Sequence, residues 1–172
     1  MGKILSKTYT VFAYGSLMKG YYGYKTIMQS AEFLGEASVN GDLRFFCSDY
    51  PVLVHKPKNG KTVKGELYRV DEETMDKIRK YEGIGNPFTV YTETVLKAET
   101  DNGTVTARSF VCIPRIVLPM MFTTRHIPEG DWHLFKASRK RLPIPKPLML
   151  FVGACALGAA AWEIFNEMGI HL

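Results

Sequence analysis

Cysteine is scarce in this sequence of 172 residues, which contains only Cys47, Cys112 and Cys155. The three are far apart and show no C-x-x-C spacing, so they predict neither a disulfide framework nor a zinc site. The first residues carry two lysines but no long apolar core, so no secretory signal is expected. These features favour a reducing, cytoplasmic location.

An excess of positive charge is missing from most of the chain, although the net charge is +5. Five of the 22 basic residues lie in one segment without any acidic residue: Lys136, Arg139, Lys140, Arg141 and Lys146. The other 17 basic side chains are balanced by 17 acidic ones. A nucleic-acid partner is therefore not expected, because binding to phosphates needs a basic face.

Signatures of several enzyme classes are absent as well. Ser16 does not lie in a G-x-S-x-G elbow, which argues against a serine hydrolase. No pair of histidines has the i, i+4 spacing that holds a metal ion on a helix; the four are His55, His126, His133 and His171. We expect neither a metal site nor another cofactor.

The sequence does contain short β-like runs and two helical candidates, which predicts an α+β fold. Four runs rich in β-branched and aromatic residues predict strands, at residues 8–14, 63–70, 88–98 and 104–113. Asn-Gly pairs at residues 57–60 and 100–103 predict two hairpins, because this pair tolerates the φ angles of a tight turn. A short helix is predicted at residues 22–30. The clearest helix is predicted at residues 72–82, between the N-cap Asp71 and the stop Gly83.

Glu82 occupies an unusual position for a carboxylate. It continues the apolar stripe of Met75 and Ile78, at the helix end where the dipole disfavours negative charge. If the last turn frays, the carboxylate reaches water and its place on the stripe means nothing. If it is partly buried, its pKa rises, and it can act as a general base and acid near neutral pH. The pattern leaves both interpretations open.

The first predicted strand ends abruptly at Tyr14-Gly15-Ser16-Leu17. Gly and Ser are usual wherever a chain leaves a strand, so a plain turn is one interpretation. The other is a binding loop, because a glycine lets successive backbone N–H groups point into one concavity that attracts a carboxylate or phosphate.

These two features occur with further motifs in a fixed order along the chain. The motifs are Tyr14-Gly15-Ser16-Leu17 with Gly20, Phe33-Leu34-Gly35-Glu36, Tyr50-Pro51, Gly65-Glu66-Leu67-Tyr68, Asp71-Glu72-Glu73-Thr74, Tyr81-Glu82-Gly83 and Gly130-Asp131-Trp132. In this combination residues 9–135 resemble the γ-glutamylcyclotransferase-like family, which includes AIG2-like and γ-glutamylamine cyclotransferase proteins. The resemblance implies a small mixed β-barrel with flanking helices and a pocket for a γ-glutamyl group.

The resemblance also implies roles for individual residues. The loop of Tyr14, Gly15, Ser16 and Leu17 would hold a small-molecule γ-glutamyl substrate, and Glu82 would be the catalytic acid and base. The substrate's α-amine would attack its own side-chain carbonyl, releasing 5-oxoproline and a free amine or amino acid without a cofactor. Many relatives carry an arginine that residues 88–91 lack, so the leaving group stays open. A non-catalytic module that binds a small metabolite or a partner is the alternative.

The sequence changes character after Trp132. We expect a domain at residues 1–135, a basic proline-containing linker at 136–147 and an apolar helix at 148–172. The uncharged run that begins this helix is shorter than the roughly 20 residues of a membrane span. Continuation through residues 148–168, with basic residues on one flank, fits a membrane anchor on the cytosolic side. A helix packed on the domain or on a second subunit is the alternative, and the oligomeric state is open.

Overall fold

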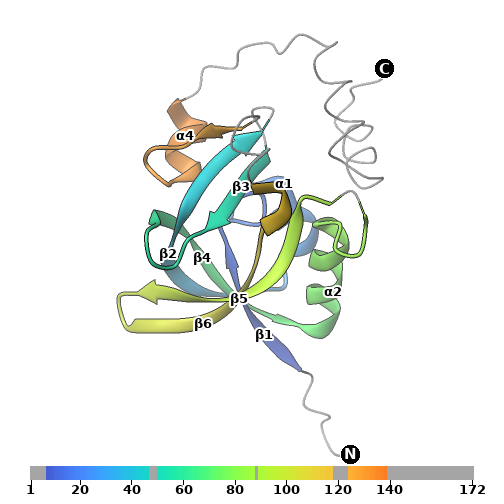
Figure 1. Ribbon diagram of the computed structural model, residues 1–172. Helices are drawn as coiled ribbons and strands as arrows, with labels where there is room; N and C mark the ends of the chain where they lie inside the picture. The colour runs from blue at the N-terminus through green and yellow to red at the C-terminus, as the bar shows by residue number, and fades with distance from the viewer. Residues whose placement is uncertain (1–6, 47–49, 88, 118–123, 139–172) are drawn as a thin grey trace, which may run out of the picture.

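The structure, a computed structural model, describes residues 7–46, 50–87, 89–117 and 124–138 (Figure 1). Its elements in chain order are β1 (Thr8–Ala13), α1 (Tyr22–Ile27), β2 (Glu32–Phe46), β3 (Tyr50–His55), β4 (Lys61–Asp71), α2 (Glu72–Tyr81), β5 (Tyr91–Thr100), β6 (Gly103–Cys112), the 3-10 turn η1 (Pro114–Ile116), β7 (Arg125–His126) and α4 (Trp132–Ser138). The described elements therefore combine strands with short helices, as the sequence predicts.

Five strands close into a barrel in the order β2-β4-β1-β6-β5, and β5 returns to pair with β2. The pairing of β1 with β6 is parallel at Val11 and Arg108, whereas the other pairings are antiparallel. The predicted α+β fold with a small mixed barrel is thus confirmed. The expected C-terminal apolar helix lies outside the described residues.

The strand β2 is 15 residues long and holds the barrel together. It pairs with β3, β4, β5 and β7 along different parts of its length. Its register shifts at a bulge between Phe33 and Gly35, where Gly35 has a φ of +132°. A glycine accepts this backbone conformation without the steric cost that a side chain would add.

The two predicted hairpins have different outcomes. Residues 100–103 form the predicted hairpin, because β5 and β6 pair from Thr100 and Gly103 onward. The prediction at residues 57–60 is wrong. The chain does turn there, with the Gly60 N–H donating to Lys56 O at 2.9 Å, but β3 and β4 each pair with β2 and not with each other. The Asn-Gly pair predicts where the chain reverses direction, but it does not predict which strands pair with each other in the sheet.

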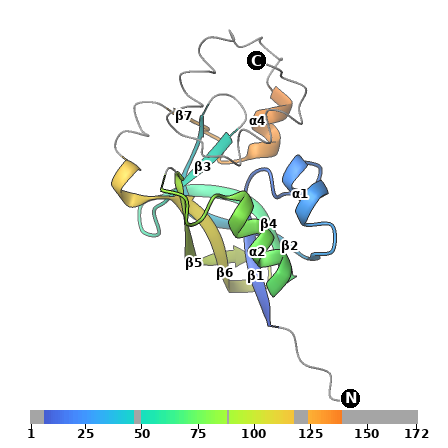
Figure 2. The same cartoon turned by 90° about the vertical axis from the view of Figure 1, so that its right-hand side faces the viewer.

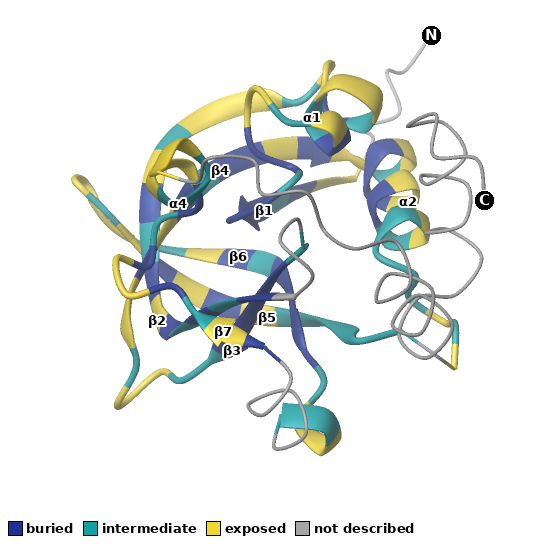
Figure 3. Cartoon of the chain, turned by 90° about the horizontal axis from the view of Figure 1, so that it is seen from above, coloured by how far each residue is buried: buried dark blue, intermediate teal, exposed yellow. Residues whose placement is uncertain are grey.

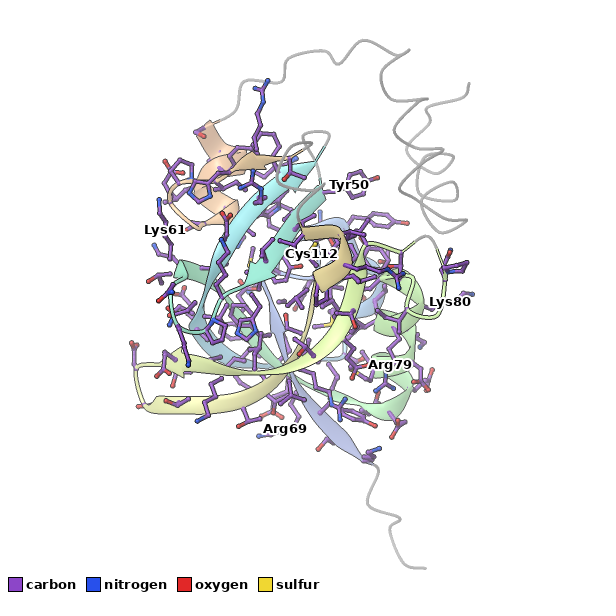
Figure 4. The ribbon with its side chains drawn as sticks, in the orientation of Figure 1. Tyr50, Lys61, Arg69, Arg79, Lys80 and Cys112 are labelled. Carbon is purple, nitrogen blue, oxygen red and sulfur yellow. The ribbon has the colours of Figure 1, made fainter. Side chains whose placement is uncertain are left out.

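The helices α1 and α2 lie side by side against one side of the barrel (Figure 2). The predicted helix at 72–82 is confirmed with Tyr81 as its last residue, and the Asp71 carboxylate accepts the Thr74 N–H at 2.8 Å as the predicted N-cap. Met75 and Ile78 are fully buried, so the predicted apolar stripe faces the core (Figure 3). Lys80 points away from the barrel on the outer side of α2 (Figure 4).

A cluster of charges fixes α2 on the strands. Glu93 of β5 accepts hydrogen bonds from Arg79 Nε at 2.8 Å and from Arg108 of β6. The pKa of the Glu93 carboxyl is lowered, chiefly by the hydrogen bond from Arg79. Tyr9 of β1 lies under the guanidinium groups of both arginines and donates its hydroxyl to Glu72 at 2.6 Å. The helix is thereby held against three strands of the barrel.

The last described helix, α4, continues through Ser138, three residues past the expected domain end at residue 135. Phe135 of α4 packs against Phe45 of β2 in a tilted arrangement with 4.5 Å between ring centroids, which places the helix on the barrel. The expected linker beyond residue 138 and the expected helix at 148–172 lie outside the described residues. Among the described helices, none has both the length and the apolar character needed to cross a bilayer.

Candidate active site

The loop Tyr14–Leu17 follows directly after β1 and turns its carbonyl groups toward the protein. The Gly15 carbonyl accepts the Met18 N–H at 3.0 Å, and the Ser16 carbonyl accepts the Tyr24 N–H of α1 at 3.1 Å. The N–H groups of Gly15, Ser16 and Leu17 donate to no acceptor within the described part of the chain. Unpaired backbone donors are costly away from water, and three in sequence can bind an anionic ligand.

Gly15 is needed because the loop passes very close to β3. A Cβ atom at this position would lie 2.3 Å from Pro51 Cγ, far inside van der Waals contact. The Pro51 carbonyl in turn accepts the hydroxyl of Tyr91 from β5 at 2.9 Å. The flanking side chains of Tyr14 and Leu17 are buried in the core, and Tyr14 donates its hydroxyl to the Phe110 carbonyl at 2.5 Å. The loop is therefore anchored on both sides of its glycine.

Glu82 is the C-cap residue of α2, with φ −78° and ψ 0°. The Ile84 N–H donates to the Arg79 carbonyl at 2.9 Å and the Gly83 N–H to the Lys80 carbonyl at 3.1 Å. With Gly83 at a φ of +69°, this pattern is a Schellman motif, in which a glycine ends the helix in the left-handed conformation. The last turn is therefore closed by hydrogen bonds, which argues against the interpretation that it frays.

The environment of Glu82 favours a neutral carboxyl group. Loss of hydration raises its pKa from 4.5 to about 8, although the residue as a whole keeps some solvent contact. Among the described residues, no hydrogen bond or ion pair joins this carboxylate to another side chain or to the backbone. Burial is the main cause that raises the pKa values of Tyr14, Tyr81 and Tyr91, and the negative charge of Glu82 raises them as well. Near neutral pH the group can therefore both give and take a proton.

The structure brings the predicted loop and the predicted acid together. Tyr14 lies close enough to Glu82 to respond to its charge, and the Ser16 side chain lies close enough to the phenol of Tyr81, the residue next to Glu82, to affect its pKa. Burial raises the pKa of Tyr81 to about 12. The sequence analysis gave no role to Tyr81 or Tyr91. Their positions beside Glu82 depend on how α2 and β5 pack, although the aromatic residue directly before Glu82 was a visible signal.

A separate hollow of about 570 Å³ is lined by Met18 but not by Tyr14–Leu17 or by Glu82. Its lining includes Glu36, Glu66 and Asp131 from β2, β4 and the segment before α4. The Glu66 carboxylate already has partners within the fold, since it accepts the Lys19 N–H at 2.8 Å and the Tyr68 hydroxyl at 2.5 Å. Within the described residues, no three His, Cys, Asp or Glu side chains are placed to hold a metal ion.

Comparison with known proteins gives the family. Residues 11–134 match the family described as Gamma-glutamyl cyclotransferase, AIG2-like, and the chain belongs to it. A provisionally named gamma-glutamylcyclotransferase from Methanocaldococcus jannaschii is 33% identical over 73 residues, covering 42% of this chain and 60% of that protein. Gamma-glutamylaminecyclotransferase C from Danio rerio is 33% identical over 76 residues, covering 40% and 50%. The chain thus spans little more than half the length of these relatives.

The fold is shared with solved structures of the family at greater sequence distance. An AIG2-like protein from Mus musculus superimposes with a TM-score of 0.58 at 20% identity, covering 80% of this chain and 99% of that one. At this identity the likeness describes the backbone arrangement only.

Proposed function

We propose that the protein is a γ-glutamyl cyclotransferase that converts a γ-glutamyl amide into 5-oxoproline and a free amine or amino acid, with Glu82 as the general base and acid. The support for this proposal is the burial of the Glu82 carboxyl, which raises its pKa to about 8, together with a loop in which three successive N–H groups donate to no acceptor among the described residues. Catalytic carboxylates with a pKa near the working pH are typically produced by such burial.

The proposed reaction removes two protons from the substrate's α-nitrogen. Glu82, ionised, takes the first from the α-ammonium group, and the freed amine attacks the γ-carbonyl carbon. The new C–N bond closes a five-membered lactam, and the lactam nitrogen gives up its second proton as the original amide C–N bond breaks. Both protons pass to the leaving nitrogen, one of them from Glu82, so the amine leaves as an ammonium ion. The nucleophile is tethered to the carbonyl it attacks, so the protein mainly holds the bent conformer.

The loop supplies the electrostatic part of the proposal. The N–H groups of Gly15, Ser16 and Leu17 are directed to the substrate's α-carboxylate or to the oxygen that becomes negative during attack. The buried side chains of Tyr14 and Leu17 fix the loop, so the donors need no rearrangement when the ligand arrives.

The test is to incubate the purified protein with γ-glutamyl dipeptides and γ-glutamyl-ε-lysine and to measure 5-oxoproline. We expect turnover of at least one compound, and a loss of about 10² to 10⁴ in rate for Glu82→Gln, the range ascribed to general acid–base catalysis. Glu73→Gln removes an exposed carboxylate from the same helix and is the matched control, with wild-type rate expected. Wild-type activity in Glu82→Gln would refute the mechanism. Tight binding of these compounds without turnover would favour the non-catalytic binding module.

We further propose that the enzyme works in the cytoplasm and that residues 148–168 attach it to a membrane surface. The support is the uncharged sequence after the basic residues that end at Lys146. A full-length chain should float with vesicles containing anionic lipids, and a variant ending at Arg141 should stay with the soluble fraction. Equal distribution of both chains would contradict the proposal.

A further inference from the structure

The carbonyl group of Glu82 needs a hydrogen-bond donor from outside the helix. The Schellman motif pairs the carbonyls of Arg79 and Lys80 with Ile84 and Gly83, but Glu82 is past the last turn. The donor is the hydroxyl of Thr89, whose Oγ1 lies 3.0 Å from the Glu82 carbonyl oxygen.

The same hydroxyl oxygen also fixes the beginning of β5. It accepts the N–H of Tyr91 at 3.1 Å, so one side chain connects the end of α2 with the first residue of the strand. Tyr91 stands beside the Glu82 carboxyl and donates its own hydroxyl to Pro51, against which Gly15 packs. Thr89 therefore links the acid, one wall of the site and, through Pro51, the substrate loop.

The position of Thr89 is itself determined by the turns that precede it. The Asn86 N–H donates to the Gly83 carbonyl at 3.0 Å, and the Thr89 N–H donates to the Asn86 carbonyl at 3.1 Å. A Cβ atom on Gly83 would lie 3.5 Å from Thr89 Oγ1, so the threonine side chain lies next to the glycine that ends the helix. The segment after the helix thus returns the Thr89 hydroxyl to the residue that carries the acid.

We infer that Thr89 is a positioning residue for Glu82: its hydroxyl holds the backbone of Glu82 so that the carboxylate stays within the site and out of bulk water. This inference rests on the proposed function. The Glu82 side chain starts from this backbone, so a displacement of the helix end moves the carboxylate with it. A misplacement of about 1 Å in a catalytic group can cost on the order of 10²-fold in rate.

The substitutions that test this role are Thr89→Val and Thr89→Ser. Valine keeps the shape of threonine but leaves the Glu82 carbonyl and the Tyr91 N–H without partners, whereas serine keeps the hydroxyl. Thr106→Val places the same change at an exposed position on β6 and is the matched control. Circular dichroism and urea unfolding establish that each variant is folded before it is compared.

The first readout does not require turnover. In protein labelled with ¹³C at the glutamate carboxyls, the Glu82 signal is assigned by its loss in Glu82→Gln and then titrated. Wild type, Thr89→Ser and Thr106→Val should show a pKa near 8, and Thr89→Val a value displaced toward the ordinary 4.5. The neighbouring groups do not interfere: burial raises the pKa of Tyr81 to about 12 and that of Cys112 to about 11, and it raises the pKa values of Tyr14 and Tyr91 well above the usual range of a phenol.

The second readout is kinetic. Thr89→Val should lower kcat for 5-oxoproline release by at least about tenfold with little change in KM, and Thr89→Ser should restore it. Equal titration and equal kcat in Thr89→Val and wild type would overturn the inference. Loss of both properties in Thr89→Ser would also overturn it, because the hydroxyl would then not be the cause. If wild type releases no 5-oxoproline at all, the proposed function fails, while the titration still decides the role of Thr89.

Discussion

Replacing Glu82 by glutamine should make the folded protein more stable at alkaline pH while it removes the proposed catalytic group. The folded state raises the pKa of this carboxyl from 4.5 to about 8 by withdrawing it from water. Between these two values the folded chain binds the proton more tightly than the unfolded chain does. The stabilising contribution is complete below pH 4.5 and is lost as the pH rises through about 8, because ionising a poorly hydrated carboxyl is unfavourable.

The size of the effect follows from the same two pKa values. Each unit of pKa difference corresponds to about 1.4 kcal/mol, so wild type should lose up to about 3 kcal/mol between pH 5.5 and pH 9 through this group alone. The partial solvent contact of Glu82 makes about 1 to 3 kcal/mol the expected range. Glutamine is neutral at both pH values and avoids this loss.

The assay is urea unfolding of wild type and Glu82→Gln at pH 5.5 and pH 9. Other titrating groups affect both proteins alike, so the difference between their unfolding free energies isolates Glu82. We expect this difference to grow in favour of Glu82→Gln by about 1 to 3 kcal/mol at the higher pH. The exposed control Glu73→Gln should follow wild type within about 0.5 kcal/mol. A Glu82→Gln difference that is the same at both pH values would refute the claim that the carboxyl is dehydrated.

Three further substitutions test the supports of the site. Asp71→Ala removes the N-cap of α2 and should lower the unfolding free energy by about 1 kcal/mol in urea, without changing the rate per folded molecule. Gly15→Ala would place a methyl group 2.3 Å from Pro51 Cγ, so the loop must move, and steady-state kinetics should show a raised KM. Glu93→Gln weakens the hold on Arg79. Because the folded state lowers the pKa of Glu93, its contribution is present at neutral pH and disappears as the pH falls below 4.5. The difference in unfolding free energy from wild type should be about 1 to 3 kcal/mol at pH 7 and should shrink as the pH is lowered below 4.5.

The parts of the fold that could be predicted are those with local causes. The helix α2 has its cap at Asp71, its stop at Gly83 and its stripe at Met75 and Ile78, and each of these follows from spacing along the chain. The Asn-Gly turn between β5 and β6 is equally local. The raised pKa of Glu82 could be anticipated from the same helix, because position on the stripe and position at the C-terminus both oppose ionisation.

The parts that could not be predicted depend on pairing between distant segments. The strand β2 contains Asn40-Gly41-Asp42, a combination typical of turns, and it is extended only because neighbouring strands pair with it on both sides. The turn at residues 57–60 was interpreted as a hairpin because the sequence does not show that β2 lies between β3 and β4. Thr89 and Tyr91 are distant in sequence from the loop at Gly15, and only the closed barrel brings them to the same site.

The most direct test of the account is a crystal structure of Glu82→Gln with an uncleaved γ-glutamyl substrate bound. We expect the side chain at position 82 to lie within about 3.2 Å of the substrate's α-nitrogen, the reach that a general base requires. We also expect the α-carboxylate or the γ-carbonyl oxygen to accept the N–H groups of Gly15, Ser16 and Leu17. A substrate bound away from this loop, or with its α-nitrogen turned from position 82, would contradict the account.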